Sequence, residues 1–221
     1  MYRIAPAIIT QLERKLSSYE VIDRVKTDDQ SVELITSIEQ VKATKKEISG
    51  VLKFDRLLAI QHRGQIYRVP ETVESPFVFD TRSEFRPFLI VLYHAQDEAV
   101  DKLNHILSPS REPVVVPSSI PVQEIHNFVE NSAASIKYCS WKDVNIPHIS
   151  KSALWGPDVA RAKQDFQRYN THGKINYVMI EMANTGWVIA ISEEARVIFY
   201  TKTEEHEIVK FLEQSIEPLV S

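Results

Sequence analysis

The segment Leu58-Ala59-Ile60-Gln61-His62-Arg63-Gly64-Gln65-Ile66-Tyr67-Arg68-Val69 is the clearest indication of the fold class. Two runs containing apolar residues flank Arg63-Gly64, and glycine readily adopts the positive φ that a tight hairpin turn requires. The sequence therefore predicts an antiparallel hairpin over residues 57–69. Pro70 is expected to end the second strand, because proline cannot donate a ladder hydrogen bond.

The residues on either side of this hairpin extend the same pattern. Short runs rich in β-branched or apolar residues predict further strands at 20–25, 32–38, 48–54 and 88–93. Apolar residues spaced near 3.6 predict helices over 6–18 and 96–107. The first 107 residues are therefore expected to form one unit, an N-terminal helix, an antiparallel sheet and a closing helix.

Residues 108–121 contain four prolines in fourteen positions. Such a density forbids a helix and predicts a stiff extended connector between two domains. Its Val114-Val115-Val116 indicates that it lies against the body of the protein. Residues 122–221 are then expected to form a second α+β unit. Its predicted elements are helices at 122–130, 157–169 and 203–217, strands at 135–140, 174–182, 186–192 and 196–201, and an aromatic loop at 141–156.

The two halves resemble one another at an offset of 108 residues. Leu89-Ile90-Val91 aligns with Val197-Ile198-Phe199, and similar residues follow in the helix after each strand. Upstream of residue 88 the match fails, and a strand that runs into a helix is a common pattern, so coincidence is the alternative. The predicted fold class is α+β, with mostly antiparallel sheets and flanking helices. A duplicated strand-strand-strand-helix unit is one interpretation of it.

The composition is that of a globular protein: 221 residues, 43% hydrophobic, 25% charged and a formal charge of −4. These values exclude a disordered chain, a collagen and a disulfide scaffold. Neither an apolar run long enough to cross a bilayer nor a secretory signal is visible. A single cysteine, Cys139, favours a reducing, cytoplasmic setting. Glycine-rich phosphate loops, hydrolase motifs and standard zinc motifs are absent from the sequence, which weakens an enzymatic function.

Basic residues gather in one stretch although the whole chain is acidic. Residues 42–68 carry seven lysines and arginines against two acids. We expect a contact surface formed by Lys53, Arg56, Arg63 and Arg68. With Tyr67 and His62 available for stacking, the stretch is typical of a β-surface that binds nucleic acid. The alternative is a solvated strand edge, where lysines discourage sheet-to-sheet aggregation.

The expected aromatic loop supplies a second candidate surface, formed by Trp141, His148 and Trp155, because aromatic residues dominate interface energetics. The alternative is that the tryptophans fold back as a small core of their own. Cys139 and His148 would form an activated thiolate if the fold brought them together. The simpler interpretation of Cys139 is a buried, inert residue.

His94, Asp97 and Glu98 stand where a strand meets a helix and could face a cation. The helix dipole already explains acidic residues in a first turn, so no metal site and no cofactor are expected.

Three functions follow. The favoured one is a non-enzymatic interaction or regulatory module that binds another protein through an exposed sheet surface and the aromatic loop. The first alternative is a nucleic-acid-binding protein that uses residues 42–68. The second is an enzyme with a site near Cys139 and His148, or near His94. No membrane partner is expected, and a homodimer is left open.

Overall fold

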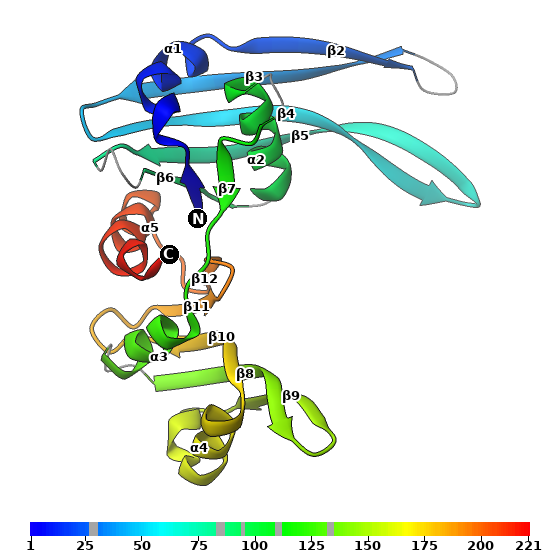
Figure 1. The fold of residues 1–221 in the computed structure, drawn as a ribbon. Coiled ribbons are helices and arrows are strands. Elements are labelled where there is room, and N and C mark those ends of the chain that lie inside the picture. Colours follow the sequence, from blue (N-terminus) through cyan, green and yellow to red (C-terminus); the bar gives the residue numbers. More distant parts are fainter. Residues whose placement is uncertain (27–30, 83–86, 94–95, 109–111, 132–134) are drawn as a thin grey trace. The chain divides into compact units, whose positions relative to one another are not determined.

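A computed structural model describes residues 1–26, 31–82, 87–93, 96–108, 112–131 and 135–221. The chain forms two compact units, Met1–Val116 and Pro117–Ser221. The division between them falls within the proline-rich segment 108–121. The fold is α+β: the described residues form five α-helices and two antiparallel sheets, of seven and five strands (Figure 1).

The first unit contains the seven-stranded sheet, in the order β2-β3-β4-β5-β6-β1-β7. The strands are β1 (Tyr2–Ile4), β2 (Glu20–Lys26), β3 (Ser31–Ala43), β4 (Glu47–His62), β5 (Gln65–Asp80), β6 (Phe88–Val91) and β7 (Val115–Pro117). A 3₁₀-helix (Pro6–Gln11) leads into α1 (Leu12–Leu16), and α2 (Gln96–Leu107) follows β6. The predicted helix over 96–107 is confirmed with the same bounds, whereas the helix predicted over 6–18 is divided into these two shorter pieces.

The predicted hairpin is confirmed, and it is longer than expected. Arg63 and Gly64 both have positive φ, 50° and 80°, as a two-residue hairpin turn requires. β4 and β5 pair without interruption from Glu47↔Asp80 to His62↔Gln65. The prediction that Pro70 ends the strand is therefore wrong. Among the described residues, the part of β5 before Phe77 pairs with β4 on one side and has no strand on the other. Proline lacks an N–H group, and on the open side no neighbouring strand needs that group for a hydrogen bond.

α1 and α2 cover one face of this sheet and enclose its core (Figure 1). Leu12 and Leu16 of α1 and Leu103 and Leu107 of α2 are almost completely buried in a cluster with side chains of β4 and β5. β7 lies at the sheet edge, where its single proline, Pro117, is tolerated. The Asn104 side chain accepts hydrogen bonds from the Val114 and Val115 amides, so it acts in place of a neighbouring strand.

The second unit contains the five-stranded sheet, in the order β12-β11-β10-β8-β9. Its strands are β8 (Ser135–Ile146), β9 (Ile149–Trp155), β10 (Lys174–Glu181), β11 (Val188–Ser192) and β12 (Val197–Phe199). Its helices are α3 (Val122–Asn131), α4 (Lys163–His172) and α5 (Glu205–Phe211). Short 3₁₀-helices occupy Val159–Arg161 and Glu217–Leu219, and a π-helix (Leu212–Ile216) continues α5. The helix predicted over 157–169 therefore begins later than expected.

The expected aromatic loop at 141–156 is wrong. Most of it is the β8–β9 hairpin, whose register runs from Tyr138↔Trp155 to Ile146↔Ile149. His148 takes the positive φ of the turn, 65°, which is uncommon for a residue other than glycine. A turn made without glycine leaves little sequence signal, and this explains the error.

The internal duplication stays a prediction. β6 lies inside its sheet, between β5 and β1, whereas β12 is an edge strand. Among the described residues, no helix has both the length and the hydropathy that crossing a bilayer requires. Within the same ranges, no three His, Cys, Asp or Glu side chains gather closely enough to hold a metal ion.

Candidate functional site

The outer part of the β4–β5 hairpin, residues 57–70, projects from the sheet and is called the arm here (Figure 1). Every residue from 59 to 70 is exposed. β3 pairs with β4 only as far as Thr36↔Phe54, and β6 reaches β5 only from Phe77. Among the described residues, the arm is therefore a two-stranded ribbon with both edges open.

One face of the arm is apolar. Side chains alternate between the two faces of a strand, so Leu58 and Ile60 share the face that carries buried Leu52 and Phe54. Their partners across the ladder are Val69 and Tyr67. The core face of the sheet thus continues into the arm, but there it is uncovered. Ile60 and Tyr67 are each 47% exposed and Val69 is 44% exposed.

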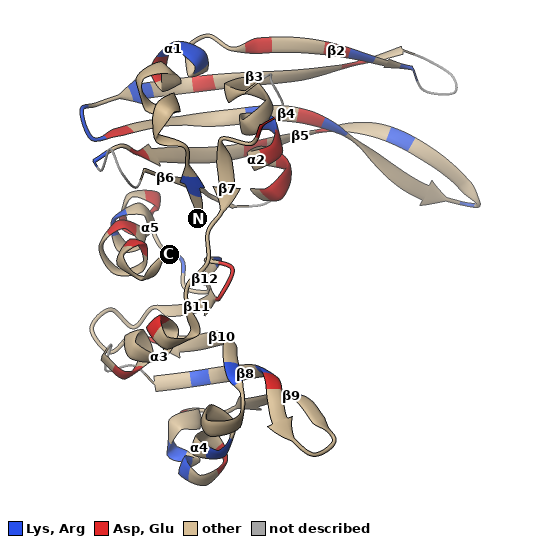
Figure 2. Cartoon of the chain, in the orientation of Figure 1, with Lys and Arg blue, Asp and Glu red and all other residues tan. Residues whose placement is uncertain are grey.

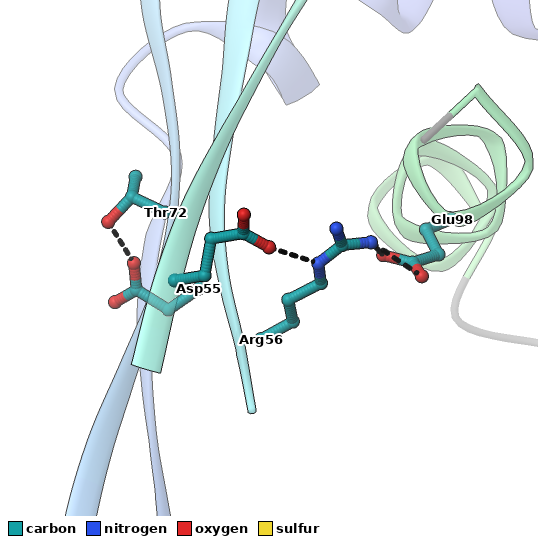
Figure 3. Close-up of polar contacts among 5 residues, drawn as sticks. Asp55, Arg56, Thr72 and Glu98 are labelled. Atoms are coloured by element: carbon teal, nitrogen blue, oxygen red, sulfur yellow. Dashed lines mark hydrogen bonds and ion pairs between the residues drawn. The ribbon is translucent and has the colours of Figure 1, made fainter. Parts of the chain in front are cut away.

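A polar cluster separates this uncovered face from the core (Figure 3). Arg56 Nε donates to Glu71 Oε2 at 2.7 Å, across the ladder, and its Nη1 lies 3.1 Å from both carboxylate oxygens of Glu98 on α2. The hydrogen bond to Glu71, and to a smaller extent the one to Glu98, raises the pKa of the Arg56 guanidinium above its usual value. Arg56 therefore fixes the base of the arm to the helix that covers the core.

A second polar cluster occupies the other face at the same level (Figure 3). Asp55 Oδ2 accepts a hydrogen bond of 2.9 Å from the Ile35 amide, and its Oδ1 accepts one of 2.6 Å from the Thr72 hydroxyl. Ile35 is the first residue of β3 beyond the last pair with β4. The carboxylate of Asp55 thus supplies an acceptor at the fork where the two strands separate.

The structure divides the four predicted cations into two pairs. Lys53 is 3.0 Å from both Glu39 and Glu74, whose hydrogen bonds raise its pKa, and Arg56 is engaged as described above. Arg63 and Arg68 lie on the arm, and neither forms an ion pair with another described residue. Figure 2 shows the acids of this hairpin nearer the body of the sheet, and the arm itself contains two arginines and no acid, a net charge of +2.

The structure does not bring the second predicted surface together. Trp141 is only 1% exposed; its indole N–H donates to Asn170 Oδ1 at 2.7 Å and its ring packs against Phe166 and Tyr169 of α4. It is a core residue. Trp155 is 78% exposed. It lies at the end of β9, and His148 precedes the beginning of that strand, which separates the two by roughly 20 Å at the usual rise of a strand.

Cys139 does not have the setting of a catalytic thiol. It is fully buried within β8, paired with Val178 and Leu154. Burial raises the pKa of its thiol far above the usual value, whereas a nucleophilic cysteine needs a lowered one. His148 is in the exposed turn at the far end of the same strand. His94, the other candidate, lies outside the described residues.

No protein-family model matches this chain, and no curated protein matches it. The apolar members of the arm, Ile60, Ile66 and Val69, were not among the residues selected from the sequence. Their signal was present nevertheless: the register of a two-residue turn at Arg63-Gly64 places Ile60 opposite Tyr67 and Leu58 opposite Val69.

Proposed function

We propose that this chain is a non-enzymatic interaction module and that its arm binds another protein. The uncovered apolar face of the arm, formed by Leu58, Ile60, Tyr67 and Val69, carries the proposal. A two-stranded ribbon standing alone is only marginally stable in water, and exposed apolar residues that adjoin one another mark interaction sites. Covering this face with a partner would bury the Tyr67 ring together with aliphatic side chains, and tyrosine is enriched in binding hot spots.

The charge of the arm specifies the partner's chemistry. Arg63 and Arg68 give the arm a net charge of +2 with no acid to offset them. The open edge of β4, beyond Phe54, offers backbone groups with which an added strand would pair. These features fit an extended segment of a partner protein in which acidic and apolar residues alternate. The acids would face the arginines and the apolar residues would cover Ile60 and Tyr67.

The charges favour this partner over a nucleic acid. Lys53 and Arg56, half of the predicted basic surface, are held by four carboxylates. The two remaining cations would neutralise two phosphates at most. Such a contact gives a salt dependence of only about −1.8 in log K against log salt, at about −0.9 per phosphate. Stable duplex-binding proteins make several times more phosphate contacts.

The proposal is tested by crosslinking from within the arm. A photoreactive phenylalanine analogue replaces Tyr67 in the full chain, which is expressed in its native cells and irradiated. We expect an adduct that nuclease leaves unchanged and in which mass spectrometry finds peptides of a second protein. Its yield should fall severalfold in the Arg63→Glu/Arg68→Glu background. The same analogue at Trp155, also highly exposed, is the matched control and should give little adduct. A nuclease-sensitive adduct, or no adduct from Tyr67, would overturn the proposal.

A further inference from the structure

The second unit contains a cavity that is independent of the arm. It has a volume of about 500 Å³ and lies between α5, with its π-helical continuation, and the connection from β10 to β11. This volume is within the range of small-molecule sites, about 300–1,000 Å³. Its lining includes Met182, Trp187, Glu207, Lys210 and Phe211.

Part of the lining is aromatic. The rings of Trp187 and Phe211 meet edge to face with centroids 5.9 Å apart, and Phe199 packs against both. Met182 beside them is buried. Trp187 and Phe211 are only half-buried, so each keeps surface that a ligand would cover. This arrangement suits a flat apolar group, since aromatic rings favour offset or edge contacts with other rings.

The rest of the lining is polar and carries both signs of charge. Glu207 and Lys210 are three residues apart on α5, so they project from the same side of the helix. Even so, neither side chain forms an ion pair or hydrogen bond with another described residue. By contrast, Lys53, Lys137 and Lys142 all have carboxylate partners within 3.0 Å. The carboxylate of Glu207 and the ammonium group of Lys210 thus both line an aromatic cavity and do not form an ion pair with each other.

The helix changes form at the same place. After Phe211 the chain widens into the π-helix Leu212–Ile216, and two of its residues, Gln214 and Ser215, line the cavity. A π-turn costs backbone hydrogen-bond quality and is frequently found at functional sites. It adds an amide and a hydroxyl group to the polar lining.

We propose that this cavity binds a free α-amino acid with an aromatic side chain. Glu207 receives the ligand's ammonium group, Lys210 receives its carboxylate, and the side-chain ring packs against Trp187 and Phe211. A zwitterion satisfies both charges at once, which neither a simple anion nor a simple cation does. The site lies in the second unit, and none of its lining residues belongs to the arm.

Calorimetric titration of the full chain with three ligands tests the assignment. L-Phenylalanine carries both charges, 3-phenylpropionate lacks the ammonium group and phenethylamine lacks the carboxylate. We expect phenylalanine to bind with a dissociation constant on the order of millimolar, as its small size allows. Each of the other two ligands should bind roughly fivefold more weakly. This factor corresponds to about 1 kcal/mol, the upper end of the free energy that one exposed ion pair contributes. Equal affinity for all three, or no binding of phenylalanine at tens of millimolar, would overturn the proposal.

Two charge variants test whether Glu207 binds the ligand's ammonium group and whether Lys210 binds its carboxylate. Glu207→Gln should weaken phenylalanine about fivefold and leave 3-phenylpropionate unchanged, because that ligand has no group for Glu207. Lys210→Gln should weaken phenylalanine to the same extent and leave phenethylamine unchanged. Lys202→Gln, an exposed lysine of the same unit outside the cavity, is the matched control. Circular dichroism confirms that each variant is folded. Binding that neither charge variant alters would place the ligand elsewhere and refute the assignment.

Discussion

Arg56 of β4 and Glu98 of α2 are 42 residues apart in sequence, and their side chains meet with Nη1 3.1 Å from both carboxylate oxygens (Figure 3). The contact joins the base of the arm to the helix that covers the core. It also marks the limit of that core, because the apolar face beyond it is uncovered. Arg56 is therefore expected to control how firmly the arm is held.

Replacing Arg56 with methionine should loosen the arm while leaving the core intact. Methionine keeps much of the aliphatic length but loses the bonds to Glu71 and Glu98. Backbone order parameters from NMR relaxation should fall toward 0.6 for residues 58–69, from about 0.85 for a rigid backbone. Arg24→Met removes an exposed ion pair with Glu33 in the other long hairpin and serves as the control. An arm as rigid in the variant as in the native protein would contradict this role.

Asp55→Ala should open the fork between β3 and β4. The Ile35 amide would lose its carboxylate acceptor and the Thr72 hydroxyl its partner. We expect a loss of about 1 kcal/mol in local opening free energy, typical of a hydrogen bond in a solvent-accessible setting. The exchange rate of the Ile35 amide hydrogen measures this opening free energy directly and should become about fivefold faster. Thr72→Ala, which removes only one of the two bonds, should leave the Ile35 rate almost unchanged. If Asp55→Ala does not accelerate exchange, the carboxylate does not close the fork.

Trp141 and Trp155 provide a test of burial against exposure. Trp141→Ala should destabilise the second unit by about 3–5 kcal/mol, because it empties a filled core site and leaves Asn170 without its donor. Trp155→Ala should change stability by less than about 0.5 kcal/mol. Denaturant unfolding followed by far-ultraviolet circular dichroism compares the two. Similar costs for both substitutions would contradict the placement of Trp141 in the core.

Cys139 should make the second unit lose stability at alkaline pH. Burial raises the pKa of the folded thiol, whereas the unfolded thiol ionises near the ordinary value of about 8.5. Above that pH the unfolded state releases a proton that the folded state keeps, so stability that is present below about pH 8.5 falls as the pH rises. The expected slope is about 1.4 kcal/mol per pH unit. Unfolding from pH 8 upward should show this extra slope in the native protein and not in Cys139→Ala. If the free energy of unfolding depends on pH in the same way in the native protein and in Cys139→Ala, the predicted role of the Cys139 thiol is wrong.

The sequence predicted the local features of the first unit well. Gly64 indicates the hairpin turn because glycine readily adopts the positive φ that such a turn requires, which is a property of that residue alone. The bounds of α2 follow from apolar spacing within twelve residues. Such signals depend on neighbours in the chain and can be recognised without a structure.

The features that position the arm depend on distant residues. The sequence predicts Arg56 as part of a contact surface, because nothing nearby in the sequence reveals that Glu71 and Glu98 converge on it. The same applies to Lys53 with Glu39 and Glu74. Trp141 looked like part of a loop because its turn contains no glycine and because its partner Asn170 belongs to a later helix. Local sequence patterns predict the helices and strands. Which charged side chains remain without an ion-pair partner depends on how those helices and strands pack together.

The central claim is that the apolar face of the arm binds a protein. Its most direct test is the affinity of the purified chain for the protein crosslinked from Tyr67, measured for the native sequence, for Ile60→Ser/Tyr67→Ser and for Trp155→Ser. We predict that the double variant on the arm loses at least about tenfold in affinity, the effect of removing about 1.4 kcal/mol of hot-spot contact, and that Trp155→Ser binds as the native chain does. Undiminished binding by the arm variant, or a loss confined to Trp155→Ser, would contradict the claim.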